Sequence, residues 1–174
     1  DDDVTDAPYK GNQEGIFGYG YVTGASGIST TNLVSNAGVV ASDVTGVGTG
    51  RRNLAACEYG GDKGIFGFGK TASTTAVTNL VSNAGVVATD TTGVGTARGY
   101  LAACSYGEDK GIFGYGSGGS GKMTNLVSNT GVVATDVTQV GTARNYLAAC
   151  SYGEDKGIFG FGDGSVVSMT NLVS

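Results

Sequence analysis

Apolar residues in this chain come in short blocks, and clusters of Gly, Asn, Asp, Ser and Thr separate the blocks. The block Gly157–Gly162, "GIFGFG", is representative. Strand alternation places Phe159 and Phe161 on one side and the residues between and around them on the other. The apolar side chains are mostly β-branched or aromatic, and no window has the i, i+3, i+4 spacing of an amphipathic helix. We therefore expect an all-β fold of short strands.

The blocks recur in a fixed order. GIFG(F/Y)G begins at Gly15, Gly64, Gly111 and Gly157, which gives a unit of about 47 residues. Each full unit continues with TNLVSN, GVVA(T/S)D, VGT(A/G)R, LAAC and a short polar turn. We expect four strands per unit, and units of this length with four strands are typical of the blades of a β-propeller.

The glycines of GIFG(F/Y)G explain why the unit is repeated. Bare backbone on one side of the strand lets the aromatic rings of a neighbouring unit approach closely. Each unit then offers rings on one side and accepts them on the other, so it needs neighbours to complete its packing. The small residues of LAAC suit the crowded centre of a ring.

These considerations predict one domain, a four-bladed β-propeller closed by pairing of the N- and C-terminal strands. A β-solenoid, with repeats stacked in a line, is the alternative fold. The sequence is also compatible with a longer array of repeats and with rings formed between chains. The predicted domain spans residues 1–174, with repeats at 15–63, 64–110 and 111–156 and a fourth blade shared by 157–174 and 1–14.

The run Val140–Gly162, "VGTARNYLAACSYGEDKGIFGFG", resembles the Kelch family of β-propellers. It has that family's order of an arginine, a small-residue inner strand, a turn and an apolar strand that ends in glycines. The similarity covers roughly residues 15–162. It implies a propeller whose loop face receives a partner. The blocks also resemble, more loosely, the Kelch-like repeats of phage structural and tail proteins.

Composition and charge argue against two classes of partner, nucleic acids and membranes. The net charge is −5 and the pI is about 4.5, so no basic stripe is available for nucleic acid. No apolar run reaches the roughly 18–20 residues of a spanning helix, so we expect no membrane insertion. Cys57, Cys104 and Cys150 occupy equivalent places in their repeats, and we expect free thiols rather than a disulfide.

Candidate chemistry is sparse. The chain has no histidine, the usual general base near neutral pH and the commonest metal ligand. The acidic pairs Glu108/Asp109 and Glu154/Asp155 lie in turns, where acids favour solubility. The aspartates that end the GVVA(T/S)D blocks, Asp43, Asp90 and Asp136, are expected to cap turns rather than to bind calcium. We expect no enzyme activity, no cofactor and no metal.

A binding face is the remaining candidate site. The loop before each LAAC strand and the variable loop after each GIFG strand should open on the same side, and variable loops on a fixed scaffold are typical of binding faces. The candidate binding residues on this side are Arg51, Arg98, Arg144, Tyr19, Tyr21, Lys70 and Lys122. The arginines have a second interpretation, in which they hold neighbouring blades together.

We expect a non-enzymatic binding or adhesion module for a protein or glycan, at a cell or virion surface. The alternative is a self-assembling structural subunit of a fibre, tail, spike or capsid decoration.

Overall fold

The computed structural model describes residues 13–119, 121–138, 141–153, 155–164 and 168–174. All regular secondary structure in these residues is β-strand, which confirms the expected all-β class. This part of the chain accordingly contains no helix able to cross a membrane.

The described residues contain twelve short strands, which follow the repeated blocks. The first two sheets are formed by β1 (Gly15–Gly20), β2 (Ile28–Val34), β3 (Ala55–Tyr59), β4 (Lys63–Gly67) and β5 (Thr78–Val81). The last two are formed by β6 (Ala102–Tyr106), β7 (Lys110–Gly114), β8 (Met123–Val127), β9 (Val137–Thr138), β10 (Ala148–Tyr152), β11 (Lys156–Gly160) and β12 (Thr170–Val173). The GIFG, TNLV and LAAC blocks are thus strands, as predicted.

The strands form four separate antiparallel sheets, ordered β1–β2, β3–β4–β5, β6–β7–β8–β9 and β10–β11–β12. In the last three, the LAAC strand turns directly into the following GIFG strand, so that Cys57 pairs with Ile65 and Cys104 with Ile112. The polar segment between these blocks is therefore the tight turn that the sequence predicts.

The fourth strand of each unit is only partly formed. The VGT(A/G)R block contributes no strand among the described residues, and the GVVA(T/S)D block leads into one only at β9. In the β3–β5 sheet it makes an isolated bridge instead, Val81 to Val87, and the residue after the block, Thr91, bridges Thr78. A side chain holds this outer segment, because Asn79 Nδ2 donates to the Ala88 carbonyl at 3.0 Å and to Asp90 Oδ1 at 2.9 Å.

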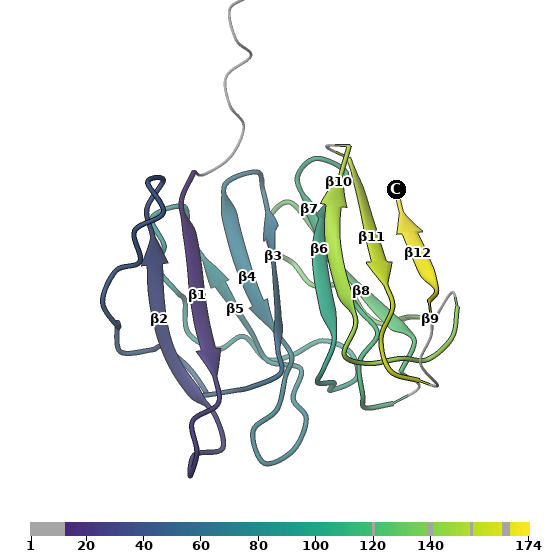
Figure 1. The fold of residues 1–174 in the computed structure, drawn as a ribbon, viewed down its shortest axis with the longest axis horizontal. Coiled ribbons are helices and arrows are strands. Elements are labelled where there is room, and N and C mark those ends of the chain that lie inside the picture. Colours follow the sequence, from purple (N-terminus) through teal and green to yellow (C-terminus); the bar gives the residue numbers. More distant parts are fainter. Residues whose placement is uncertain (1–12, 120, 139–140, 154, 165–167) are drawn as a thin grey trace, which may run out of the picture.

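The sheets are arranged as a fan. The inner strand β3 lies against β6, and β6 lies against β10. Figure 1 shows these three strands together near the centre, while the outer strands β2 and β12 lie at opposite ends of the molecule.

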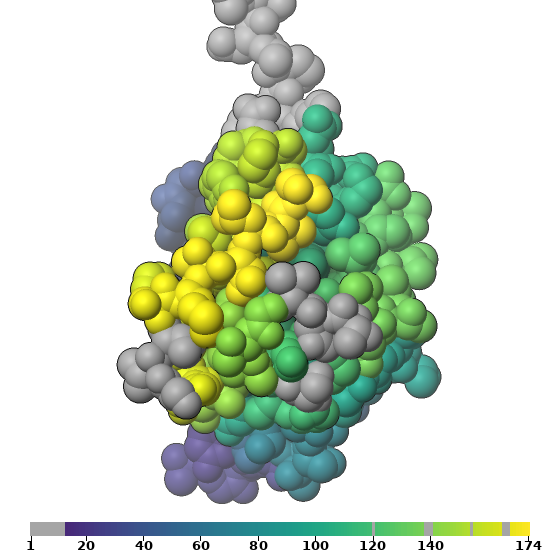
Figure 2. Space-filling model, turned by 90° about the vertical axis from the view of Figure 1, so that its right-hand side faces the viewer, coloured from purple at the N-terminus to yellow at the C-terminus, as the bar shows by residue number. Residues whose placement is uncertain are grey.

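The described residues do not show the predicted closure of the ring. The β1–β2 and β10–β12 sheets are at the two ends of the longest axis rather than beside each other (Figure 1). Figure 2 looks onto the right-hand end of that axis, where the last strands of the chain, in yellow, form part of the surface beside green and teal segments from the middle of the chain. Residues 1–12, which were expected to supply a strand to the last blade, lie outside the described residues.

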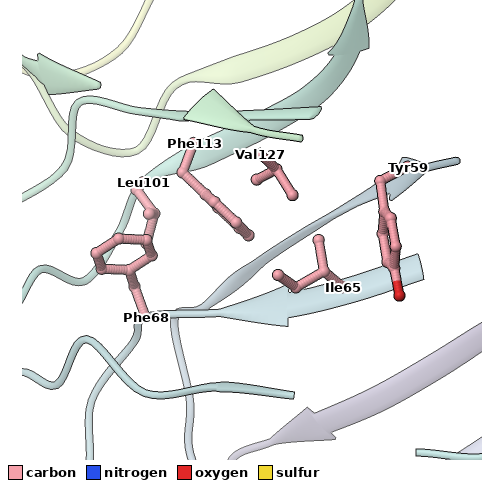
Figure 3. Close-up of a cluster of buried hydrophobic side chains, with 6 residues drawn as sticks. All are labelled: Tyr59, Ile65, Phe68, Leu101, Phe113 and Val127. Carbon is pink, nitrogen blue, oxygen red and sulfur yellow. The ribbon is translucent and has the colours of Figure 1, made fainter. Parts of the chain in front are cut away.

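The core lies between sheets. Figure 3 shows one cluster in which Phe68 of the second sheet contacts Phe113 of the third. The remaining buried members of this cluster are Tyr59, Ile65, Leu101 and Val127. Each sheet therefore buries its apolar side chains against its neighbours rather than within itself.

The two aromatic residues of each GIFG(F/Y)G block point to opposite neighbours. Phe66 contacts Tyr19 of the preceding sheet, whereas Phe68 contacts Phe113 of the following sheet. The expectation that both rings share one side, stated above for Phe159 and Phe161, is therefore wrong. The reason is local: the strand ends at Gly67, and Phe68 has a φ of 62°, so alternation stops there.

The predicted role of the glycines is confirmed. A Cβ built on Gly67 would lie 2.6 Å from Cζ of Phe113, and one on Gly114 would lie 2.8 Å from the Phe159 ring. Only a residue without a side chain lets the neighbouring ring approach this closely.

Candidate binding edge

The arginines at the end of the VGT(A/G)R blocks lie inside the molecule. The side chain of Arg98 is fully buried, with its guanidinium 4.5 Å from the centre of the Phe68 ring. Its Nε donates to the Tyr115 carbonyl at 2.9 Å, and Nη2 donates to Asn125 Oδ1 at 2.5 Å. Arg98 therefore connects the second sheet to the third.

The aspartate of the following repeat completes this arrangement. Asp136 accepts hydrogen bonds from the backbone N–H and the hydroxyl of Thr96, at 2.9 and 2.7 Å, and pairs with Arg98 Nη1 at 3.2 Å. Burial alone would raise the pKa of Asp136, but the hydrogen bonds from Thr96 and Asn125 and the charge of Arg98 outweigh it and lower the pKa below the ordinary value. Asp136 thus ties two repeats together, which goes beyond the predicted turn cap.

The first repeat has the same network. Arg51 is fully buried, donates to the Phe68 carbonyl and Asn79, and lies 3.6 Å from Asp90. The carboxylate of Asp90 accepts from Thr49, as that of Asp136 does from Thr96. Asp43, the first aspartate of the series, accepts the equivalent of the bond from Asn79 to Asp90, in this case from Asn32.

The third arginine is buried but incompletely bonded. Arg144 lies 4.0 Å from the centre of the Tyr115 ring, and its Nη2 donates to Asn171 Oδ1 at 2.6 Å. Its Nε and Nη1 are buried without a hydrogen-bond partner in the described part of the chain. All three arginines are thus inaccessible to a partner at the surface. Their contacts fit the second interpretation, in which they hold neighbouring repeats together.

Tyr19 is also internal. Its ring lies under Arg51 at 4.5 Å, and its hydroxyl donates to the Val47 carbonyl at 3.1 Å. The remaining predicted binding residues differ from it: Tyr21 is 58% exposed, and Lys70 and Lys122 are half-buried.

The loops open on one edge, as the topology predicted. Arg52 bridges Lys70, Gly99 bridges Ser117, and Asn145 bridges Asp163, so in each case the segment before a LAAC strand pairs with the variable loop after a GIFG strand. Figure 1 shows these loops together along the lower edge of the sheets. We call this side the loop edge.

A row of aromatic and basic side chains runs along the loop edge. Arg52 lies 5.0 Å from the centre of the Tyr21 ring, Lys70 lies 5.3 Å from that of Tyr100, and the rings of Tyr100 and Tyr146 are 4.4 Å apart. Because Arg52 also bridges Lys70 through the backbone, the five residues form one continuous row, and Tyr146 at its end is 63% exposed.

Sequence reasoning missed three members of this row, namely Arg52, Tyr100 and Tyr146. A signal was available, since the one or two positions after each invariant arginine differ between repeats ("RN", "GY", "NY"). Tyr100 and Tyr146 have φ values of 58° and 52°, which are uncommon for aromatic residues. In addition, the backbone N–H of Tyr100 donates to Asn53, and that of Tyr146 donates to Tyr100.

The acidic side chains of the turns are engaged in local contacts. In the described ranges no group of three or more His, Cys, Asp or Glu residues is placed to hold a metal. Asp109 is engaged by Lys110 at 3.1 Å and by Asn129 at 3.0 Å, and Asp155 pairs with Lys156. Glu154 lies outside the described residues.

The predicted free thiols are present. Burial raises the pKa of Cys57 to about 12 and that of Cys104 to about 11, whereas Cys150, in the last sheet, is exposed. The first two thiols are therefore protonated at neutral pH and unsuited to act as nucleophiles.

A scan against protein-family models gives no match for the chain, and a search of curated proteins gives none either.

Proposed function

We propose that this chain is a non-enzymatic β-propeller module of the Kelch-like type, which binds a protein or glycan through its loop edge at a cell or virion surface. The four sheets would be consecutive blades of the propeller. Two features support this fold: the inner strands β3, β6 and β10 lie side by side, and the four sheets stay separate. A solenoid would instead pair strands of successive repeats into sheets that run through the whole stack.

The observation that carries the binding function is the row Tyr21–Arg52–Lys70–Tyr100–Tyr146. Tyr and Arg are the residues most enriched in the energetic centres of interfaces. Here they come from successive repeats and lie beside the variable loops. The row is basic although the chain as a whole carries a net charge of −5, so it suits a partner with acidic groups.

The test is binding of the labelled chain to an array of neutral, sialylated and sulfated glycans, followed by variants. Tyr146→Ser and Arg52→Ser should each weaken binding roughly 30-fold, the size expected for a central interface residue. Val132→Ser is the matched control, because Val132 is 65% exposed in the turn after β8, at the other end of the strands. Loss of binding in the control, or unchanged binding in both edge variants, would contradict the proposal.

A second candidate function, a structural subunit of a fibre, tail, spike or capsid decoration, is favoured by a different observation. Large apolar side chains are exposed on the two terminal sheets, among them Phe17 on β1 and Leu172 on β12. This candidate needs contacts between copies and no ligand on the loop edge.

A further inference from the structure

The contact between neighbouring sheets, which we call a seam, is built the same way at each of the three seams in the structure. The first aromatic ring of one GIFG block covers a glycine of the preceding sheet and meets that sheet's second aromatic ring edge-on. The ring-to-ring distances at the seams are 5.1 Å for Tyr19–Phe66, 5.2 Å for Phe68–Phe113 and 5.5 Å for Tyr115–Phe159.

Two further contacts accompany the rings at two of the three seams each, a Cys–Gly contact at the second and third seams and a Leu–Gly contact at the first and second. A Cβ on Gly111 would lie 2.6 Å from Cys57 Sγ, and one on Gly157 would lie 2.6 Å from Cys104 Sγ, so each cysteine fills the space left by a glycine in the next sheet. On the outer side, Leu33 occupies the space beside Gly85 in the same manner. A seam is therefore a set of side chains on one sheet that fit glycines on the other, plus one pair of rings.

The β10–β12 sheet has the residues that face a following sheet at a seam, namely the glycine, the second aromatic ring, the cysteine and the leucine. In the described residues no sheet packs against them. Among the described residues, a Cβ on Gly160 would meet only Thr170 of its own sheet, whereas the equivalent Gly67 and Gly114 are covered by rings. Phe161 is 61% exposed and Leu172 is 67% exposed, and Cys150 is exposed while Cys104 is buried.

The β1–β2 sheet has the residues that face a preceding sheet at a seam, namely the first aromatic ring and the two glycines. Phe17, the equivalent of the buried Phe66, Phe113 and Phe159, is 66% exposed. In the part of the chain that the structure describes, Gly15, the equivalent of Gly111, has no cysteine beside it, and Gly38, the equivalent of Gly85, has no atom near its Cβ position.

We propose that the β10–β12 face of one copy binds the β1–β2 face of a second copy of this chain, head to tail. Phe17 of the second copy covers Gly160 and meets Phe161, Cys150 lies beside Gly15 of the second copy, and Leu172 lies beside its Gly38. The two faces differ, so the contact is heterologous: it generates a closed ring if the rotation between copies closes, and a filament if it does not.

The occupant is a second copy because each half matches the other by contacts already present inside the molecule, the ring contact at all three seams and the Cys–Gly and Leu–Gly contacts at two seams each. No arginine of the described residues lies over Phe161, in contrast to Arg51, Arg98 and Arg144 over the rings at the internal seams. The contact is accordingly weaker than an internal seam and reversible. It does not depend on a ligand at the loop edge.

Sedimentation velocity over a concentration series tests the proposal with two single variants. Gly160→Val fills the space meant for the ring of the second copy, and the fold tolerates it, since its Cβ meets Thr170 Cγ2 at an ordinary 3.6 Å. Phe17→Asp changes the other face at an exposed side chain. Each variant alone should weaken association roughly 30-fold or more, as expected for a central interface residue.

Mixing the two variants gives the decisive result. The Gly160→Val chain keeps an intact β1–β2 face and the Phe17→Asp chain keeps an intact β10–β12 face, so an equimolar mixture should form heterodimers. Discrete rings or filaments of the wild type both agree with the proposal. A wild-type chain that stays monomeric at all concentrations, as it would if other segments cover these faces, overturns it. So does a mixture that associates no better than each variant alone.

Discussion

At the scale of single residues, the arginine that ends each VGT(A/G)R block links neighbouring repeats. Arg98 stacks on Phe68 in one sheet and donates to Tyr115 and Asn125 in the next. Burying a guanidinium costs free energy unless its donors are paired, and removal of the arginine leaves its partners unpaired inside the protein.

We expect Arg98→Ala to lower the free energy of unfolding by about 3–5 kcal/mol, because it breaks a buried ion pair together with its hydrogen bonds. Arg52→Ala, one position after the equivalent Arg51 and on the loop edge, should change it by about 0.5 kcal/mol. Urea denaturation followed by circular dichroism measures both. Equal effects of the two substitutions would show that Arg98 does not hold the sheets together.

The recurrence of these arginines and aspartates at equivalent positions indicates that they have the same role in each repeat. It does not indicate which residues they contact. Asp136 binds Thr96, 40 residues earlier, and not a neighbour in its own turn. Spacing along the chain carries no information about such a contact, because it depends on how two sheets face each other. For the same reason the binding assignment of Arg51, Arg98 and Arg144 could not be separated from the structural one.

At the scale of single strands, the GIFG(F/Y)G block determines how sheets pack. Its first aromatic ring points back and its second points forward, because the second residue has a left-handed backbone, with φ of 60–65° at Tyr19, Phe68, Tyr115 and Phe161. Alternation predicts the strand and the use of its glycines. Alternation gives the wrong side for the second ring, because the sequence pattern does not reveal that the strand ends before this residue.

Equivalent glycines of this block should differ in their tolerance of a side chain. Gly67→Val places a Cβ 2.6 Å from the buried ring of Phe113 and should lower the free energy of unfolding by about 1–3 kcal/mol. Gly160→Val, at the same place in the last repeat, has room and should have a much smaller effect. Thermal unfolding at a protein concentration too low for association compares the two. A large loss for Gly160→Val would mean that its face is covered within the monomer.

At the scale of the whole molecule, the repeat predicted the all-β class and the separate sheets that pack through rings and glycines. It could not predict how many sheets complete a ring. That number depends on the angle between neighbouring sheets, and the angle is set by packing details that every repeat shares. An identical seam can thus build a closed ring or an open fan.

Hydrogen exchange distinguishes an open fan from a closed ring in solution. In the fan, β6 and β7 are covered by sheets on both sides and contain the fully buried Phe113, so their amides should exchange slowest. Among the described residues, β1, β2 and β12 have a neighbouring sheet on one side only, and they should exchange fastest in dilute protein. A monomer closed into a ring would give every sheet two neighbours, and uniform protection along the four sheets would therefore contradict the fan. Because a second copy covers only the two end faces, raising the protein concentration should slow exchange in β1, β2 and β12 and leave β6 and β7 unchanged.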